Sequence, residues 1–209
     1  MKQLSKNQKV FFELLRAGLW EREARLSQYN DIDYSALMQL AAEQSVFGMV
    51  AAGLEHVKDV KVPQEWALQF AGQTLQLERR NKAMNGFIEG FICKLRNVGV
   101  YTLLVKGQGI AQCYERPLWR ACGDVDLFLS DENYVKAAAL LPALASSIDE
   151  DRPETKHLAM TIDGWVVELH GTLRSQLGKR IDDVIDEVQE DTFRNGRVRT
   201  WRNGDVNVF

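Results

Sequence analysis

The sequence predicts an α+β protein in which a helical N-terminal region precedes an α/β part. Three observations lead to this prediction. Apolar residues recur at helical spacing through the first half of the 209-residue chain. The β-rich segment VYTLLV then begins at residue 100 between two glycines, and two short apolar segments around Asp163-Gly164 indicate a hairpin. We therefore place a boundary near residue 98, with a helical region over residues 1–98 and an α/β core over residues 99–209.

Three helices are expected before this boundary. The first is a short amphipathic helix near the N-terminus. The same spacing continues from residue 37 to residue 54, which predicts one second helix with Asp33 or Asn30 as its cap. Pro63 suits the first turn of a third helix, and Gly99 is a natural stop after its apolar face.

Strands and a further helix are expected after the boundary. A strand over residues 125–129 follows the first one, and Ser130 opens a helix behind it. The strongest hairpin signal surrounds Asp163-Gly164, and a second hairpin surrounds Asn203-Gly204. The sequence stops at Phe209 within an expected strand, so we expect the core to be truncated at its C-terminus.

The composition disfavours several functional classes. A net charge of −3 argues against general nucleic-acid binding, which depends on a basic surface facing phosphates. Cys93, Cys113 and Cys122 have no C-x-x-C spacing, so they indicate neither a zinc site nor a disulfide framework. No apolar run reaches the roughly 18–20 residues of a membrane span, and no secretory signal pattern begins the chain. We therefore expect a cytoplasmic protein with no membrane contact.

Two aspartates lie two positions apart in a predicted strand. Asp124 and Asp126 then point to the same face, and the repulsion between their carboxylates favours a bound cation. Glu168 lies within the apolar run WVVELH, on the return strand of the first hairpin. If the two strands are neighbours, the three carboxylates form a Mg²⁺ site that can hold two ions about 3.5–4 Å apart. Such a centre is typical of phosphoryl or nucleotidyl transfer.

Two other motifs are excluded. A calcium-binding loop starting at Asp124 fails because Leu129 takes the position that requires glycine. The segment KGQG lacks the pattern of a P-loop. The remaining alternative is a pair of acids on a solvent-exposed strand. Against it, residues 127–129 are apolar, so the strand enters the core directly after the two aspartates.

The neighbouring polar residues have open interpretations. Lys106 and the backbone N–H groups after it would cradle a triphosphate, or the segment is a glycine turn with a surface lysine. Arg116 and Arg120 either bind phosphate or pair with nearby acids. His170 is a candidate base or metal ligand, but a structural histidine is the commoner case, and His157 is a weaker candidate.

The run LLVKGQGIAQCYERPLWRACGDVDLFL, followed some forty residues later by ELH, resembles the uncharacterised nucleotidyltransferase family of the DNA polymerase β-like superfamily. The matching residues are Lys106-Gly107, Tyr114, Pro117, Arg120, the segment from Gly123 to Asp126, and Glu168 with His170. The resemblance implies a small mixed β-sheet flanked by helices. It also implies that Asp124 and Asp126 are metal ligands, with Glu168 as the third acid. The Gly-Ser or Gly-Gly pair that is usual in the superfamily is replaced here by Lys-Gly.

These patterns and the resemblance give one leading hypothesis. We expect Mg²⁺-dependent transfer of a nucleoside monophosphate from a nucleoside triphosphate such as ATP to an unidentified acceptor hydroxyl. Asp124, Asp126 and Glu168 would be the catalytic and metal-binding residues. Lys106, Gly107, Arg120 and Gly123 would bind the nucleotide. The alternatives are a non-catalytic nucleotide-binding or regulatory module of the same fold and an interaction scaffold built on the helical half.

Overall fold

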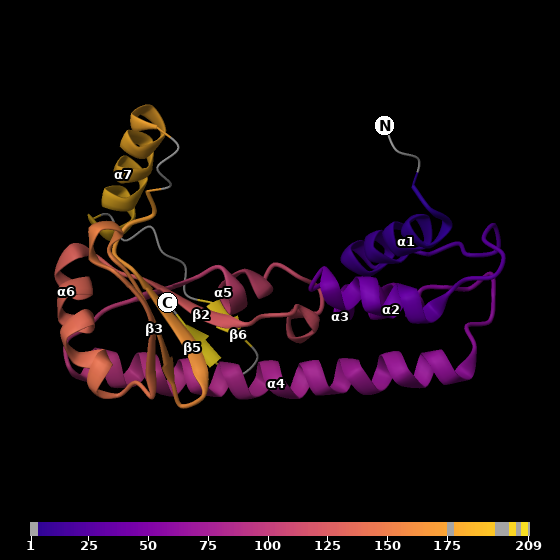
Figure 1. The fold of residues 1–209 in the computed structure, drawn as a ribbon, viewed down its shortest axis with the longest axis horizontal. Coiled ribbons are helices and arrows are strands. Elements are labelled where there is room, and N and C mark those ends of the chain that lie inside the picture. The colour runs from indigo at the N-terminus through magenta and orange to yellow at the C-terminus, as the bar shows by residue number, and fades with distance from the viewer. Residues whose placement is uncertain (1–3, 175–177, 195–200, 204–205, 209) are drawn as a thin grey trace. The chain divides into compact units, whose positions relative to one another are not determined.

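The computed structural model describes residues 4–174, 178–194, 201–203 and 206–208 (Figure 1). It confirms the α+β class, with helices first and a mixed sheet after them. The chain divides into two compact units. The first consists of Met1–Ala83 and Cys113–Ala121, and the second consists of Met84–Gln112 and Cys122–Phe209.

The first unit is helical. Its elements are α1 (Lys6–Trp20), α2 (Tyr34–Glu43), α3 (Phe47–Glu55), residues 64–83 of α4 (Gln64–Asn97) and the 3-10 turn η1 (Pro117–Trp119). The expected cap at Asp33 is confirmed, because its carboxylate accepts a hydrogen bond from the Ala36 amide at 2.9 Å. The single helix expected over residues 37–54 is wrong. Ser45 has a φ of +55°, which breaks the helix between α2 and α3.

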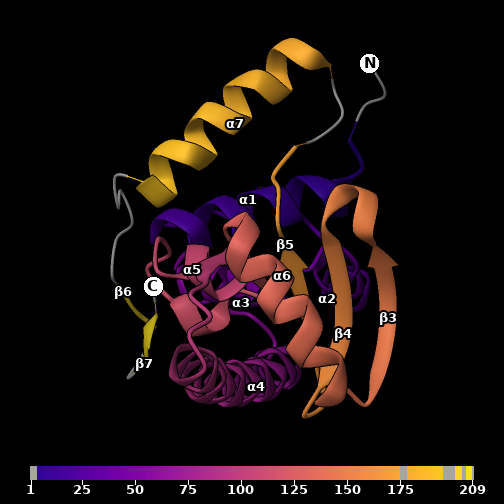
Figure 2. The same ribbon diagram turned by 90° about the vertical axis from the view of Figure 1, so that its left-hand side faces the viewer.

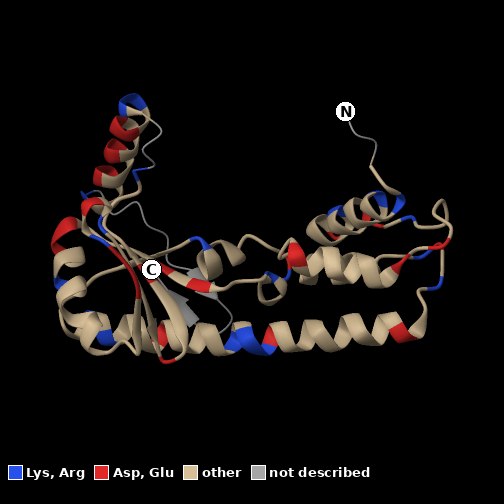
Figure 3. Cartoon of the chain, in the orientation of Figure 1, with Lys and Arg blue, Asp and Glu red and all other residues tan. Residues whose placement is uncertain are grey.

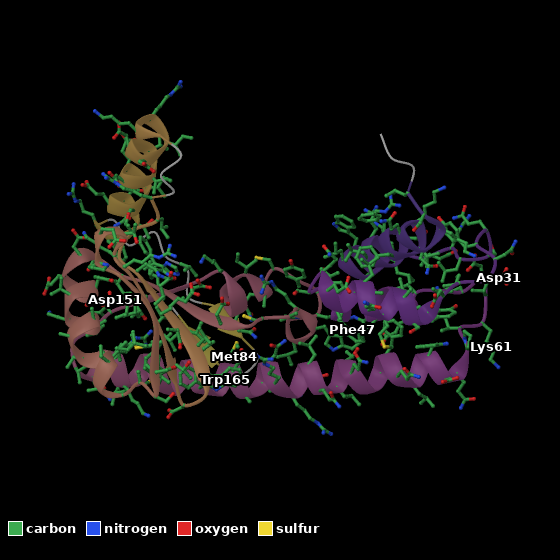
Figure 4. The ribbon with its side chains drawn as sticks, viewed as in Figure 1. Asp31, Phe47, Lys61, Met84, Asp151 and Trp165 are labelled. Carbon is green, nitrogen blue, oxygen red and sulfur yellow. The ribbon has the colours of Figure 1, made fainter. Side chains whose placement is uncertain are left out.

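Aromatic and aliphatic side chains fill the core of the first unit. Phe47, marked in Figure 4, stacks on Phe70 with ring centroids 5.1 Å apart. Helices α1 and α3 approach closely because Gly18 and Gly53 lie where they touch. A Cβ at Gly53 would be 2.0 Å from the carbonyl oxygen of Leu14, so only glycine fits there.

The second unit is built on a five-stranded mixed sheet in the order β1-β2-β5-β4-β3. The strands are β1 (Leu103–Val105), β2 (Asp124–Phe128), β3 (Ser147–Arg152), β4 (His157–Ile162) and β5 (Trp165–His170). Only the central pair β2 and β5 is parallel within this sheet, and the other neighbours are antiparallel. The Asp-x-Asp strand and the return strand of the hairpin are therefore neighbours, which is the condition for their acids to share one face.

The hairpin of β4 and β5 turns at the expected residues. Asp163 and Gly164 have φ angles of +50° and +80°, as the two central residues of a tight type I′ turn require. Strand β3 was not expected from the sequence, because SIDEDR carries almost no apolar residue. It pairs with β4 alone and forms an edge of the sheet, where polar side chains are tolerated.

One face of the sheet is apolar and covered by helices. Residues 84–97 of α4 and helix α6 (Asp131–Leu140) pack on side chains such as Leu127, Met160 and Val167 (Figure 2). Met84 belongs to this core, and Trp165 packs against it (Figure 4). The expected helix start is confirmed, because the Ser130 hydroxyl caps α6.

The opposite face of the sheet carries polar side chains from β2, β4 and β5. Helix α5 (Gly107–Ala111) follows β1, and helix α7 (Lys179–Arg194) follows β5. The ring of Phe193 in α7 lies 4.9 Å from that of Phe128 in β2. Helix α7 was not expected from the sequence, and acidic side chains run along it (Figure 3).

The last strands are β6 (Trp201–Asn203) and β7 (Val206–Val208), which pair antiparallel and confirm the second hairpin. Its turn, residues 204–205, lies outside the described residues. Among the helices that the structure describes, none combines the length and the apolar composition of a membrane span.

Candidate functional site

Three carboxylates lie on the polar face of the sheet, on two adjacent strands. In the parallel register, Asp126 of β2 lies opposite Glu168 of β5, and Asp124 lies opposite Val166. Since side chains two positions apart share a face, Asp124, Asp126 and Glu168 all belong to the same side of two adjacent strands. The alternate residues Val125 and Val167 face the helix-covered core. The apolar pattern of each strand therefore fixes the direction of its acids.

Asp126 is the most buried of the three acids, with only 2% of its surface exposed. One of its carboxylate oxygens accepts two hydrogen bonds, from Lys106 Nζ at 2.6 Å and from His170 Nε2 at 2.9 Å. Val105 pairs with Asp126 across β1 and β2, which brings the next residue, Lys106, beside the acid. Two cationic or proton-donating groups thus already surround this carboxylate.

The charges around these acids shift their protonation in opposite directions. Burial, and then the charges of Asp126 and Glu168, raise the pKa of Asp124. Burial also opposes the charge of Asp126, but the hydrogen bonds from His170 and Lys106 outweigh it and lower the pKa of Asp126. Burial disfavours the Lys106 ammonium, yet its hydrogen bond to Asp126 and the field of the other two acids raise its pKa. The site is therefore a negative cluster that attracts cations.

Lys106 has an unusual backbone. Its φ and ψ angles are +51° and −140°, a region that residues with a side chain rarely adopt. The next residue, Gly107, has a φ of +23°, and a Cβ there would lie 2.8 Å from Cys122 Sγ. Glycine at position 107 thus allows the chain to pass close to the start of β2. A strained lysine that points to the acids fits a functional role better than a simple surface turn.

Gly123 and Arg120, the other two predicted nucleotide-binding residues, belong to different units of the chain. Gly123 immediately precedes Asp124, and a Cβ at Gly123 would meet open space, so packing does not require glycine there. Arg120 belongs to the first unit. There its carbonyl oxygen accepts a hydrogen bond from Asn81, and its guanidinium lies 5.9 Å from the Tyr114 ring centroid. Their roles in nucleotide binding stay predictions.

Two histidines adjoin the acids, and the sequence interpretation had favoured neither as a functional residue. His157 of β4 and His170 of β5 lie opposite each other in the antiparallel register. Their Nε2 atoms are 3.4 and 3.5 Å from the same Glu168 oxygen. The positions of His157 and His170 at equal distance from the Asp163-Gly164 turn would have predicted this pairing, because a two-residue turn fixes the register of its strands.

A separate cavity of about 660 Å³ opens beyond the carboxyl ends of β2 and β5. It lies among the start of α6, the loop after β5 and helix α7, and its lining includes Ser130, Gly171 and Phe193. Its volume lies in the range of small-molecule sites, roughly 300–1,000 Å³. In the described part of the chain, none of the predicted site residues lines this cavity.

The helical region and the five-stranded mixed sheet flanked by helices are consistent with a nucleotidyltransferase-like fold. The model of the family described as "Uncharacterised nucleotidyltransferase" matches residues 30–205, and the chain belongs to this family. This membership supports a role in nucleotidyl transfer and a nucleotide as substrate. No match was found among curated proteins, and none among solved structures.

Proposed function

We propose that this protein transfers a nucleoside monophosphate from a nucleoside triphosphate to an acceptor hydroxyl, with Mg²⁺ held by Asp124, Asp126 and Glu168. The observation that carries the proposal is the register of β2 and β5, in which Asp126 lies opposite Glu168 with Asp124 on the same face. Family membership supplies the reaction class.

The three acids suit the metal in kind and in charge. Mg²⁺ prefers oxygen ligands and commonly binds through a few carboxylates together with substrate phosphates. Burial raises the pKa of Asp124 most, and the charges of Asp126 and Glu168 raise it further. A divalent cation would relieve that repulsion. When bound, Mg²⁺ neutralises phosphate charge and makes an attacking hydroxyl more acidic.

Each residue has a proposed task. Asp124 and Asp126 hold the cation against the triphosphate, and Glu168, which is partly exposed, accepts the proton of the acceptor hydroxyl. Lys106 exchanges its ion pair with Asp126 for a phosphate oxygen, since its side chain is 56% exposed and free to reorient at that end. These tasks amount to positioning and charge neutralisation, which dominate catalysis of phosphoryl transfer.

A direct test is pyrophosphate release from each of the four nucleoside triphosphates, with Mg²⁺ and a panel of hydroxyl acceptors. We expect Glu168→Gln to lower the rate at least about 100-fold, because a general base typically contributes that much. Asp163→Asn is the matched control. It removes a carboxylate from the same hairpin at a turn position with positive φ that asparagine also favours. Equal rates in the wild type and Glu168→Gln would overturn the assignment of Glu168.

One observation favours the second candidate, a non-catalytic nucleotide-binding module. Lys106 and His170 already neutralise Asp126, so the fold accommodates this acid without requiring a metal. The two candidates differ in outcome. The module binds nucleoside triphosphate in calorimetry but releases no pyrophosphate with any acceptor.

A further inference from the structure

Two histidines lie beside the acids and offer nitrogen rather than oxygen as a ligand atom. His157 and His170 come from opposite strands of one hairpin, and Glu168 lies two residues before His170 on the same face. One ligand atom from each of these three residues lies within 4.8 Å of the other two. Their side chains are between 13% and 24% exposed, so an ion can reach them from solvent.

The two histidines contact Glu168 at distances that are long for hydrogen bonds, although the His157 Nε2–Glu168 contact is still a weak one, and these distances match the separation of ligands around a metal ion. One Glu168 oxygen lies 3.4 Å from His157 Nε2 and 3.5 Å from His170 Nε2. Good hydrogen bonds between such atoms are roughly 2.7–3.2 Å long. Ligands about 2.0–2.2 Å from a tetrahedral ion are separated from each other by roughly 3.3–3.6 Å. Both distances to Glu168 therefore match the spacing of ligands around one ion, and the three ligand atoms all lie within 4.8 Å of one another.

The surroundings of His157 support the same interpretation. Its second ring nitrogen, Nδ1, is buried and lies 3.4 Å from the Glu150 carboxylate of β3, without the geometry of a hydrogen bond. Histidines that bind metals usually direct their other nitrogen to a carboxylate or a carbonyl, which fixes the ring orientation. Glu150 is the carboxylate nearest to this nitrogen, and a small shift when a metal binds would complete the hydrogen bond.

We propose that His157, Glu168 and His170 bind a zinc-class divalent metal, at a site that lies beside the Asp124–Asp126 pair and shares Glu168 with the proposed Mg²⁺ site, so that the two ions compete for this carboxylate. Two imidazoles and one carboxylate are the ligand set of open zinc sites, whereas Mg²⁺ prefers oxygen alone. Three protein ligands leave the fourth position of a tetrahedral ion to water or substrate. Binding also takes His170 Nε2 away from its hydrogen bond to Asp126, because one ring nitrogen cannot serve both. The proposal does not rest on the proposed transferase function.

The test measures binding of Zn²⁺ by calorimetry, and of Co²⁺ by its visible absorption, to full-length protein purified without a polyhistidine tag and with Mg²⁺ in excess. We expect one bound ion and the strong absorption of tetrahedral Co²⁺. His157→Gln should weaken binding more than about 100-fold, since even outer partners of ligands contribute roughly 10–100-fold. Glu150→Gln should weaken it by that smaller factor.

Three further variants keep this test decisive. His157→Cys retains a zinc ligand and should restore tight binding, which shows that loss in His157→Gln is not misfolding. The chain contains three histidines. His56 lies in the first unit and pairs with Glu21, so His56→Gln is a control variant. His56→Gln and Asp124→Asn should leave Zn²⁺ affinity unchanged. Undiminished binding in His157→Gln, or equal loss in Asp124→Asn, would overturn the proposal, while Mg²⁺-dependent nucleotide binding reports separately on the transferase site.

Discussion

Lys106 illustrates how one residue links backbone strain to the chemistry of the site. Its backbone conformation suits glycine, yet its ammonium lies 2.6 Å from a buried carboxylate. A strained conformation of this kind costs of the order of 1–3 kcal/mol and persists only where surrounding contacts hold it. Here the pairing of β1 with β2 and the close passage of Gly107 supply those contacts. Lys106 thereby serves as an internal cation for Asp126.

This arrangement predicts opposite effects of Lys106→Met on two ligands. Mg²⁺ alone should bind more tightly, because no ammonium competes for Asp126. A nucleoside triphosphate with Mg²⁺ should bind about tenfold more weakly, because a charged hydrogen bond to phosphate is lost. Calorimetry with each ligand measures both effects. Lys136→Met, which removes the surface pair with Glu132 on α6, is the control and should change neither. Equal affinities in Lys106→Met and the wild type would contradict this role.

The acids of the site were predictable residue by residue, whereas the histidines were not weighed as a pair. Alternation within β2 and β5 fixed the faces of Asp124, Asp126 and Glu168 from the sequence alone. Which strands are neighbours depends on long-range pairing, so their convergence was conditional. Taken alone, His157 is a weaker candidate than His170, although the hairpin register places the two opposite each other.

Elements with strong local signals were the most predictable. The β4–β5 hairpin, the cap of α2 and the start of α6 follow from turn and capping residues. Strand β3 and helix α7 were missed. Strand β3 is held by pairing with β4 rather than by apolar residues of its own. Helix α7 did carry a local signal, because Ile181, Val184 and Ile185 recur at helical spacing among its acids, and this signal was not used. The break at Ser45 was missed because the apolar pattern runs on through it.

The contact of α1 with α3 predicts a contrast between two glycines. Gly53→Ala should destabilise the protein by at least about 1–3 kcal/mol, because a Cβ would overlap the Leu14 carbonyl. Gly72→Ala, on the exposed side of α4 with open space around it, should stabilise the protein by roughly 0.5–1 kcal/mol. Urea unfolding measures both changes. A neutral Gly53→Ala would contradict the close packing of these two helices.

Asp59 gives the first unit a defined response to acid. Its carboxylate accepts hydrogen bonds from the amides of Leu26 and Ser27 at 3.0 and 2.9 Å. Hydrogen bonds from Ser27, and then from Leu26, lower the pKa of Asp59 from 3.8 to about 2. Because the folded pKa is lowered, this contribution to stability is complete above pH 3.8 and is lost as the pH falls toward 2.

Thermal unfolding of Asp59→Asn checks this response. Asparagine does not titrate, so the difference in Tm from the wild type should be largest near neutral pH and should shrink below pH 3.8. Glu65→Gln, an exposed acid in the first turn of α4, is the control. A difference in Tm that stays constant from neutral pH down to about 2 would rule out the proposed hydrogen bonding of Asp59.

At the scale of the whole molecule, the acids, the lysine and both histidines of the site all belong to the second unit. Helices α4 and α6 cover the apolar face of its sheet, so the site lies on the other face. The α+β class was predictable because helical spacing and strand signals occupy different halves of the chain. The division of the chain into two units was less predictable, because residues 113–121 follow the first strand in the sequence but belong to the helical unit.

The central claim is that Asp126 and its neighbours bind a nucleoside triphosphate through Mg²⁺. Thermal unfolding with each of the four nucleoside triphosphates, with and without Mg²⁺, tests it most directly. At 100 times its dissociation constant, a ligand of the folded state adds about 2.7 kcal/mol of stability. We predict a rise in Tm that requires both components, disappears in Asp126→Asn and survives in Asp163→Asn. A rise of equal size without Mg²⁺, or in Asp126→Asn, would contradict the claim.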